Sequence, residues 1–269
     1  MKYDAAVIGA GVMGCSTALH LARAGMKVVL LDRGPICREA SGVNAGTLTM
    51  QMTRAALIPY ALRAYDMWLR MAEWCDGGHV LATACPGLSV AFTEQEAAML
   101  EERARIRAAA GAPIEIVSTA RAREIEPGLS PQALLAGHCP MDGFASAYLT
   151  GRAFRPALLK AGVDLREDCA VQGVDAGFTL DTAAGRMDAR RLVLAGGVWL
   201  GEMAGWLGVP LPIKTLIKQL VVTERMEPVM RTVLGVASGL LSLKQYANGT
   251  VLIGGGWQGI GDNTRGGIA

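Results

Sequence analysis

The sequence predicts an α/β fold in which a parallel sheet carries helices between its strands. Three observations support this prediction. The first 32 residues alternate strand, glycine turn, helix and strand. A second apolar strand, near residue 192, also runs directly into glycines. The chain holds 34 glycines among 269 residues, about 13%, against a usual share of about 7%. Clustered glycines permit tight turns and let a ligand approach the backbone closely.

The composition excludes several classes of protein. Hydrophobic residues make up 51% of the chain and the formal net charge is +2, so we expect neither a disordered chain nor a nucleic-acid partner. Six cysteines without a C-x-x-C pair, together with three histidines, predict no metal site. We expect reduced thiols and a cytoplasmic location, or peripheral attachment at the inner membrane. No membrane span is predicted, because every run of about 18 apolar residues contains a charge or a glycine cluster.

The first predicted unit has the pattern of a dinucleotide-binding turn. An apolar strand over residues 3–8 leads into a G-x-G-x-x-G turn, a helix covers 15–24, and a strand over 27–31 ends at Asp32. Gly9 permits the tight turn, Gly11 lets a pyrophosphate approach the backbone, and Gly14 lets the helix pack closely on the sheet. Asp32 is expected to accept hydrogen bonds from ribose hydroxyls. From this pattern we predict cofactor contacts at Gly9, Gly11, Val12, Met13, Gly14, Asp32 and Arg33.

The glycine turn alone leaves NAD and FAD open as cofactors, and the next segment favours FAD. Ser41, Asn44 and Gly46 follow the second strand in the spacing Ser-x-x-Asn-x-Gly. On this segment the sequence resembles the D-amino-acid oxidase superfamily of FAD-dependent amine oxidoreductases, which includes glycine oxidases, sarcosine oxidases, and opine or amino-acid dehydrogenase subunits. The resemblance implies that the loop wraps the flavin pyrophosphate and passes near the flavin ring. The implied contacts are Ser41, Asn44, Ala45, Gly46 and Leu48.

A second segment later in the chain supports the same resemblance. An apolar strand over 191–194 is followed by Ala195-Gly196-Gly197-Val198-Trp199, similar to the second flavin signature of that superfamily. The resemblance implies flavin contacts from Ala195, Gly196 and Trp199, although a core or helix-start role for Trp199 stays equally open. By the same resemblance, the backbone of Val171 reaches the adenine. The implied architecture is a Rossmann-like FAD-binding domain of the glutathione-reductase type, with an inserted mixed-sheet α+β substrate domain.

The remaining elements follow from periodicity, capping and turn residues. Helices are predicted over 59–75, 93–111, 118–126 and 149–161, and strands over 80–84, 88–92, 163–165, 170–174, 178–182, 186–189, 220–223, 239–246 and 250–254. The hairpin 178–189 turns at Ala184-Gly185, and another turns at Asn248-Gly249. The predicted FAD-binding domain comprises 1–80 and 145–212, and the predicted substrate domain comprises 81–144 and 213–269.

The resemblance implies hydride transfer from the carbon that bears nitrogen to flavin N5, which gives an imine that water hydrolyses. Small-molecule amines or amino acids are the expected substrates, of the glycine, sarcosine, D-amino acid, proline or opine type. Oxygen or a respiratory carrier is the expected electron acceptor. We assign no catalytic residue. Four side chains are candidates by position for binding a substrate carboxylate, and a fifth could face the substrate or lie in the core: Arg54, Lys214, Lys218, Lys244 and Tyr246.

Several alternatives stay open at this stage. An NAD-dependent dehydrogenase, a flavin-binding non-catalytic subunit or an inactive fragment would share the first motif. Monomeric sarcosine oxidases, which the chain resembles, carry an oxygen-activating lysine at the position of Leu252, and its absence favours dehydrogenase over oxidase behaviour. Family members also continue beyond the position that matches Ala269. We therefore expect the chain to be an N-terminal portion of a longer protein, or a short variant that a second subunit completes.

Overall fold

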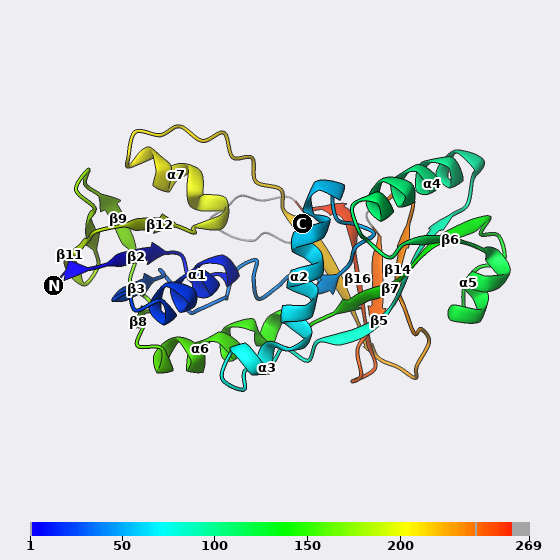
Figure 1. Ribbon diagram of the computed structural model, residues 1–269, viewed down its shortest axis with the longest axis horizontal. Helices are drawn as coiled ribbons and strands as arrows, with labels where there is room; N and C mark the ends of the chain where they lie inside the picture. Colours follow the sequence, from blue (N-terminus) through cyan, green and yellow to red (C-terminus); the bar gives the residue numbers. More distant parts are fainter. Residues whose placement is uncertain (1, 240, 260–269) are drawn as a thin grey trace.

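The computed structural model describes residues 2–239 and 241–259. The molecule is elongated, with a parallel sheet in one half and a large mixed sheet in the other (Figure 1). The parallel sheet has the strand order β12-β2-β3-β8, and all of its pairs are parallel. Its strands are β2 (Ala5–Ile8), β3 (Val28–Leu31), β8 (Asp164–Arg166) and β12 (Leu192–Leu194). Every residue of β2 and β3 is buried, as expected for a parallel sheet covered on both faces.

Two different layers cover the parallel sheet. Helices α1 (Val12–Arg23) and α6 (Thr150–Lys160) pack on one face in a common hydrophobic cluster. A small sheet and the short helix α7 (Leu200–Gly205) cover the other face. The small sheet has the order β1-β11-β10-β9 and comprises β1 (Lys2–Tyr3), β9 (Val171–Val174), β10 (Thr179–Thr182) and β11 (Gly185–Ala189). This half matches the α/β unit that the sequence predicts.

The second half is built on a mixed sheet with the order β13-β16-β15-β14-β5-β7-β4, and β6 also pairs with β7. The pair of β14 and β5 is parallel, whereas the other pairs are antiparallel. Helices α4 (Glu94–Ala109) and α5 (Thr119–Ile125) lie at its outer end (Figure 1). The strands are β4 (Thr47–Leu48), β5 (Thr83–Ala91), β6 (Glu115–Ser118), β7 (Leu135–Phe144), β13 (Lys218–Arg225), β14 (Val233–Val236), β15 (Ser242–Gln245) and β16 (Thr250–Gln258).

The structure corrects several predicted elements. The helix expected over 59–75 is divided at Arg70 into α2 (Ile58–Leu69) and α3 (Met71–Trp74). The two strands expected around Pro86 form the single strand β5, because the pairing with β7 shifts register at this proline and needs no N–H from it. Strands β6, β7 and β14 were not predicted. β7 contains Gly137, Pro140 and Gly143, which are unfavourable in strands, and neighbours on both sides hold it in place.

Other predictions from local signals are confirmed. The Thr93 hydroxyl accepts the N–H of Glu96 while the Glu96 carboxylate accepts the N–H of Thr93, which completes a capping box at the start of α4. The hairpin of β10 and β11 forms as expected, but its turn residues are Ala183 and Ala184, one position earlier than predicted, because Gly185 already pairs with Thr182. Three short 3₁₀ helices complete the described elements: η1 (Ala55–Leu57), η2 (Ala147–Leu149) and η3 (Gly197–Trp199).

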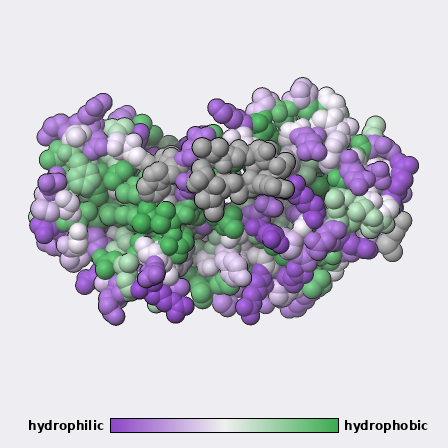
Figure 2. Space-filling view, turned by 180° about the vertical axis from the view of Figure 1, so that it is seen from behind, coloured by the Kyte–Doolittle hydropathy of each residue, from purple (hydrophilic) through white to green (hydrophobic). Residues whose placement is uncertain are grey.

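The surface of the mixed-sheet half carries exposed apolar side chains. Figure 2 shows hydrophobic residues gathered on the rear of this half. Val221 and Val222 of β13 are 49% and 60% exposed, and Leu216 before them is 53% exposed. Within the part of the chain that the structure describes, no helix is both long and apolar enough to cross a membrane. The predicted C-terminal segment 264–269 lies outside the described residues.

Candidate cofactor site

The two glycine segments that the sequence singled out meet at neighbouring strand ends. β2 and β12 are adjacent and parallel, and the N–H of Ala195 donates to the carbonyl of Ile8 at 2.8 Å. Gly9 has φ +104°, and a Cβ on it would lie 2.5 Å from the carbonyl oxygen of Ala195. A Cβ on Gly14 would lie 1.8 Å from the carbonyl oxygen of Gly9. Glycine is therefore needed at both positions for the helix and the second turn to approach β2.

Gly11 is placed differently from Gly9 and Gly14. A Cβ at this position would meet a single near atom, the Ser41 hydroxyl oxygen, at 3.1 Å, so the space in front of Gly11 is open. Ser41 accepts the N–H of Val12 at 3.0 Å and draws its loop onto the start of α1. The first turn of α1 contains no acidic side chain. Open space, the remaining N–H groups of the first turn and the helix dipole together fit a bound phosphate.

Asp32 lies at the carboxyl end of β3 and holds the glycine turn in place. Its Oδ2 accepts the N–H of Ala10 at 2.6 Å, and its Oδ1 accepts the N–H of Gly34 at 3.0 Å. Sequence reasoning gave Asp32 a contact with ribose only. The structure adds two backbone contacts, and each carboxylate oxygen keeps a lone pair for a further donor.

Replacing Asp32 by asparagine should both loosen the glycine turn and weaken flavin retention. An amide offers one acceptor oxygen, so one of the N–H groups of Ala10 and Gly34 loses its partner. We expect a loss of about 1–3 kcal/mol in the free energy of unfolding, measured with urea, together with a lower flavin content. Asp66→Asn serves as the control, because Asp66 makes only an exposed ion pair with Arg70. Equal stability of both variants would contradict the role given to Asp32.

The loop after Ser41 owes its shape to Asn44 and Gly46. The Asn44 amide donates to the carbonyl of Ala40 at 2.8 Å, and its Oδ1 accepts the N–H of Gly46 at 2.7 Å. Gly46 has φ +64°, and a Cβ on it would lie 1.9 Å from the carbonyl oxygen of Ala145. The predicted Ser-x-x-Asn-x-Gly segment therefore forms a compact loop that presses against the residues before α6.

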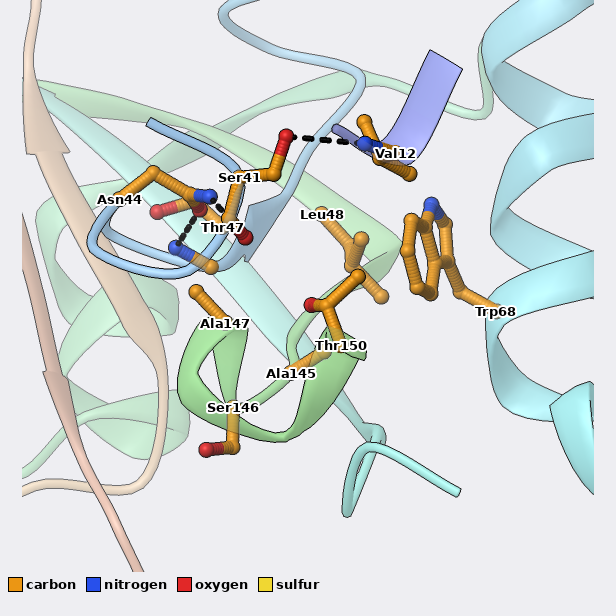
Figure 3. Close-up of a pocket in the computed structure, with 11 residues that line it drawn as sticks. Val12, Ser41, Asn44, Thr47, Leu48, Trp68, Ala145, Ser146, Ala147 and Thr150 are labelled. Carbon is orange, nitrogen blue, oxygen red and sulfur yellow. Dashed lines mark hydrogen bonds between the residues drawn. The ribbon is translucent and has the colours of Figure 1, made fainter. Parts of the chain in front are cut away.

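A pocket of about 160 Å³ opens between this loop, the start of α1 and helix α2 (Figure 3). Figure 3 shows Val12 and Trp68 on one side, and the turn that contains Ala145 and Thr150 below the loop. The volume is below the range of about 300–1,000 Å³ that is usual for ligand pockets, so it would accommodate one part of a large cofactor. The lining residues are Val12, Ser41, Asn44, Gly46, Thr47, Leu48, Trp68, Ala145, Ser146, Ala147 and Thr150.

Five of the predicted contacts line this pocket, namely Val12, Ser41, Asn44, Gly46 and Leu48. The others lie elsewhere along the glycine turns and strand ends. The Arg33 guanidinium lies over the Trp199 ring, 3.9 Å from its centroid, and so joins the ends of β3 and β12. Val171 is packed with the small sheet, two residues after Cys169, whose N–H donates to the carbonyl of Asp32. Sequence reasoning missed Trp68, Ala145 and Thr150, because α2 and α6 reach the pocket only through tertiary packing.

The candidates for carboxylate binding differ in burial. Arg54, Lys214 and Lys218 are exposed, whereas Lys244 is fully buried. The half-buried Tyr246 donates its hydroxyl to the carbonyl of Ala145 at 3.2 Å, and its ring packs edge-on against Phe144. Within residues 2–239 and 241–259, no group of three or more His, Cys, Asp or Glu side chains could hold a metal ion.

Burial changes the titration of Lys244 and predicts a pH-dependent stability. Desolvation lowers the pKa of its ammonium to about 8, from an ordinary 10.5. The unfolded chain therefore keeps this proton to higher pH than the folded protein, so folding becomes more favourable as pH rises from about 8 to 10.5. Relative to Lys244→Met, the wild type should gain about 3 kcal/mol of unfolding free energy across that window. Urea unfolding of both proteins at several pH values checks this, and a pH-independent difference would contradict it.

The fold and the site together define an α/β domain with glycine turns typical of dinucleotide-binding proteins, joined to a mixed-sheet unit. Residues 4–268 match the model of the family described as "DAO: FAD dependent oxidoreductase". The chain belongs to this family, and it is thereby placed among FAD-dependent amine and amino-acid oxidoreductases. The predicted family resemblance and fold class are confirmed.

Individual relatives agree with this placement. The chain is 28% identical over 263 residues to glycine oxidase of Geobacillus kaustophilus, covering 94% of this chain and 70% of that protein. It is 27% identical over 272 residues to a subunit of the opine oxidase of Rhizobium meliloti, with the same two coverages. The crystal structure of glycine oxidase from Geobacillus kaustophilus superimposes with a TM-score of 0.88 at 26% identity, over 97% of this chain and 73% of that one. L-proline dehydrogenase from P. horikoshii, at 20% identity and a TM-score of 0.86, shares the fold over 96% of this chain and 70% of that one.

Proposed function

We propose that this chain binds FAD and oxidises the C–N bond of an amino acid or secondary amine. The observation that carries the proposal is the meeting of two glycine turns at the ends of β2 and β12, with open space at Gly11. Membership of an FAD-dependent family favours FAD over NAD, which the first turn alone would also allow. The proposed cofactor contacts are those predicted from the sequence.

Different residues of this chain would contact different parts of the cofactor. The start of α1 would hold the pyrophosphate with its N–H groups, and Asp32 would hold the ribose. The loop from Ser41 to Leu48 would lie against the flavin ring, with Trp68 closing the opposite side of the pocket. When bound, FAD supplies a hydride acceptor, so the protein has to orient the substrate and exclude water rather than provide the redox chemistry.

The substrate class rests on the relatives. The names of the two curated relatives concern glycine and opines, and both are amino-acid or secondary-amine compounds. We propose that the mixed sheet forms the substrate domain. Its strands lie within the predicted segments 81–144 and 213–269, except for β4, which comes from the predicted FAD-binding segment 1–80. A second polypeptide is likewise a proposal, supported by the name of the opine oxidase relative, which is one subunit of its enzyme.

Absorbance of the purified protein tests the proposal directly. Bound flavin should give a yellow protein, and anaerobic addition of the right amine should bleach it. The panel comprises glycine, sarcosine, proline, D-amino acids and opines, with and without an artificial electron acceptor. A yellow protein that no amine bleaches would favour the alternative of a flavin-binding subunit without catalytic activity. A colourless protein that cannot be reconstituted with FAD would contradict the proposed function.

A further inference from the structure

A buried cluster of polar side chains lies directly behind the loop that lines the pocket. The Lys244 ammonium donates to the hydroxyl of Thr47 and, at 3.0 Å, to that of Ser242. The two hydroxyl oxygens are themselves 3.0 Å apart and share a hydrogen bond. Ser242 and Lys244 come from β15, whereas Thr47 is the first residue of β4 and lines the pocket. The cluster therefore connects the mixed sheet to the pocket wall.

Lys244 carries a charge that its surroundings do not neutralise. Its exposed fraction is 0%, and no carboxylate of the described residues lies within ion-pair distance of it. The nearby Cys85 thiol stays neutral, because burial raises its pKa to about 11. With its own pKa near 8, Lys244 is mostly protonated at neutral pH. A buried cation in this state is costly unless an anion completes its environment.

The position of Lys244 indicates where that anion would lie. Lys244 is directly opposite Leu252 in the register of β15 and β16, so both side chains project from the same face of the sheet. The sequence predicted only that Leu252 cannot supply the positive charge of the lysine that monomeric sarcosine oxidases carry at this position. The structure instead supplies a cation from the neighbouring strand. Because Lys244 is covered by Thr47, the cation would act on a resident group held against the loop rather than on a freely exchanging ligand.

We propose that Lys244 is a positioning residue that stabilises negative charge on a flavin held against residues 44–48, acting through the Thr47 hydroxyl. This inference rests on the proposed function. Lys244 donates to both hydroxyl oxygens, and these share one hydrogen bond, so the Thr47 proton is free for a further acceptor when the Ser242 hydroxyl donates that bond. A donor polarised by a buried ammonium binds an anionic group more strongly than an ordinary hydroxyl does.

Sulfite binding tests the inference without any amine substrate. Sulfite forms a sulfur–nitrogen bond with oxidised flavin through its own lone pair, and the product carries the added negative charge and loses its visible absorbance. Lys244→Gln keeps a donor for the two hydroxyls but removes the charge. We expect its sulfite affinity to be at least about 10-fold weaker than that of the wild type, and its flavin reduction potential to be lower. Lys244→Arg should restore most of the affinity.

The control variants distinguish an effect of the Lys244 charge from a general effect on the structure. Lys160→Met removes a lysine that pairs with Asp76 on the surface, and should leave sulfite affinity unchanged. Thr47→Val removes the relaying hydroxyl at nearly constant volume, and should also weaken sulfite binding. If the Lys244→Gln variant does not retain flavin, sulfite affinity is measured on the Lys244→Met and Thr47→Val variants instead. Yellow variants that bind sulfite as tightly as the wild type would overturn this inference alone. A colourless wild type would overturn it together with the proposed function.

Discussion

Replacing Gly11 by glutamate should abolish flavin retention and leave the chain folded. The backbone of Gly11 has φ −71°, which any residue can adopt, and a Cβ there meets only the Ser41 hydroxyl oxygen at 3.1 Å. A longer acidic side chain would fill the open space and place negative charge at the start of α1, where a pyrophosphate would bind. The ratio of flavin to protein absorbance should fall to near zero, while the free energy of unfolding in urea stays within about 1 kcal/mol of the wild type.

Gly14→Val is the matched substitution, and its main expected effect is a loss of stability. A Cβ on Gly14 would lie 1.8 Å from the carbonyl oxygen of Gly9, which is backbone and cannot move aside. Helix α1 would have to shift off the sheet, so we expect a loss of about 3–5 kcal/mol in unfolding free energy. Stoichiometric flavin in Gly11→Glu would contradict the cofactor placement. A fully stable Gly14→Val protein would contradict the packing of α1 on β2.

The motif predicted different roles for these two glycines, with phosphate approach at Gly11 and close helix packing at Gly14. Spacing alone correctly predicted the strand, turn, helix and second strand, because each depends on neighbours within about 30 residues. The loop from Ser41 to Gly46 was equally local, and the structure shows it as a compact turn. The motif could not predict which residues from the rest of the chain lie beside the turn. Ser41 lies beside Gly11, and Ala195 lies beside Gly9 and Gly14, and both residues reach the turn from later parts of the chain.

The elements that sequence reasoning missed depend on partners far away in the chain. β7 reads Leu-Ala-Gly-His-Cys-Pro-Met-Asp-Gly-Phe, a composition typical of a loop. It is a strand because β5, β6 and β4 pair with it along its length. Lys244 was one of four candidates for binding a carboxylate, all chosen by position. Its burial follows from the pairing of β15 with β14 and β16, which no local pattern records.

Removing the carboxylate of Asp142 should detach the pocket loop from β7. Asp142 is 1% exposed, and its oxygens accept the Thr49 hydroxyl and the N–H of Met50, each at 2.8 Å. Both donors follow β4 directly, so Asp142 fixes the segment that carries Thr47 and Leu48. In Asp142→Ala both donors lose their partner in a buried position. We expect a loss of about 3 kcal/mol in unfolding free energy and a lower flavin content.

Asp142→Asn is the control, because it keeps both contacts without the charge. The amide oxygen can accept the N–H of Met50, and the amide nitrogen can donate to the Thr49 oxygen. Burial raises the pKa of Asp142, so the folded protein holds its proton more strongly than the unfolded chain does. The wild type should therefore lose stability relative to Asp142→Asn as pH rises above the ordinary carboxyl range, and keep it in acid. Urea unfolding across pH measures this difference. An Asn variant as unstable as the Ala variant would show that charge, rather than the two hydrogen bonds, holds the loop.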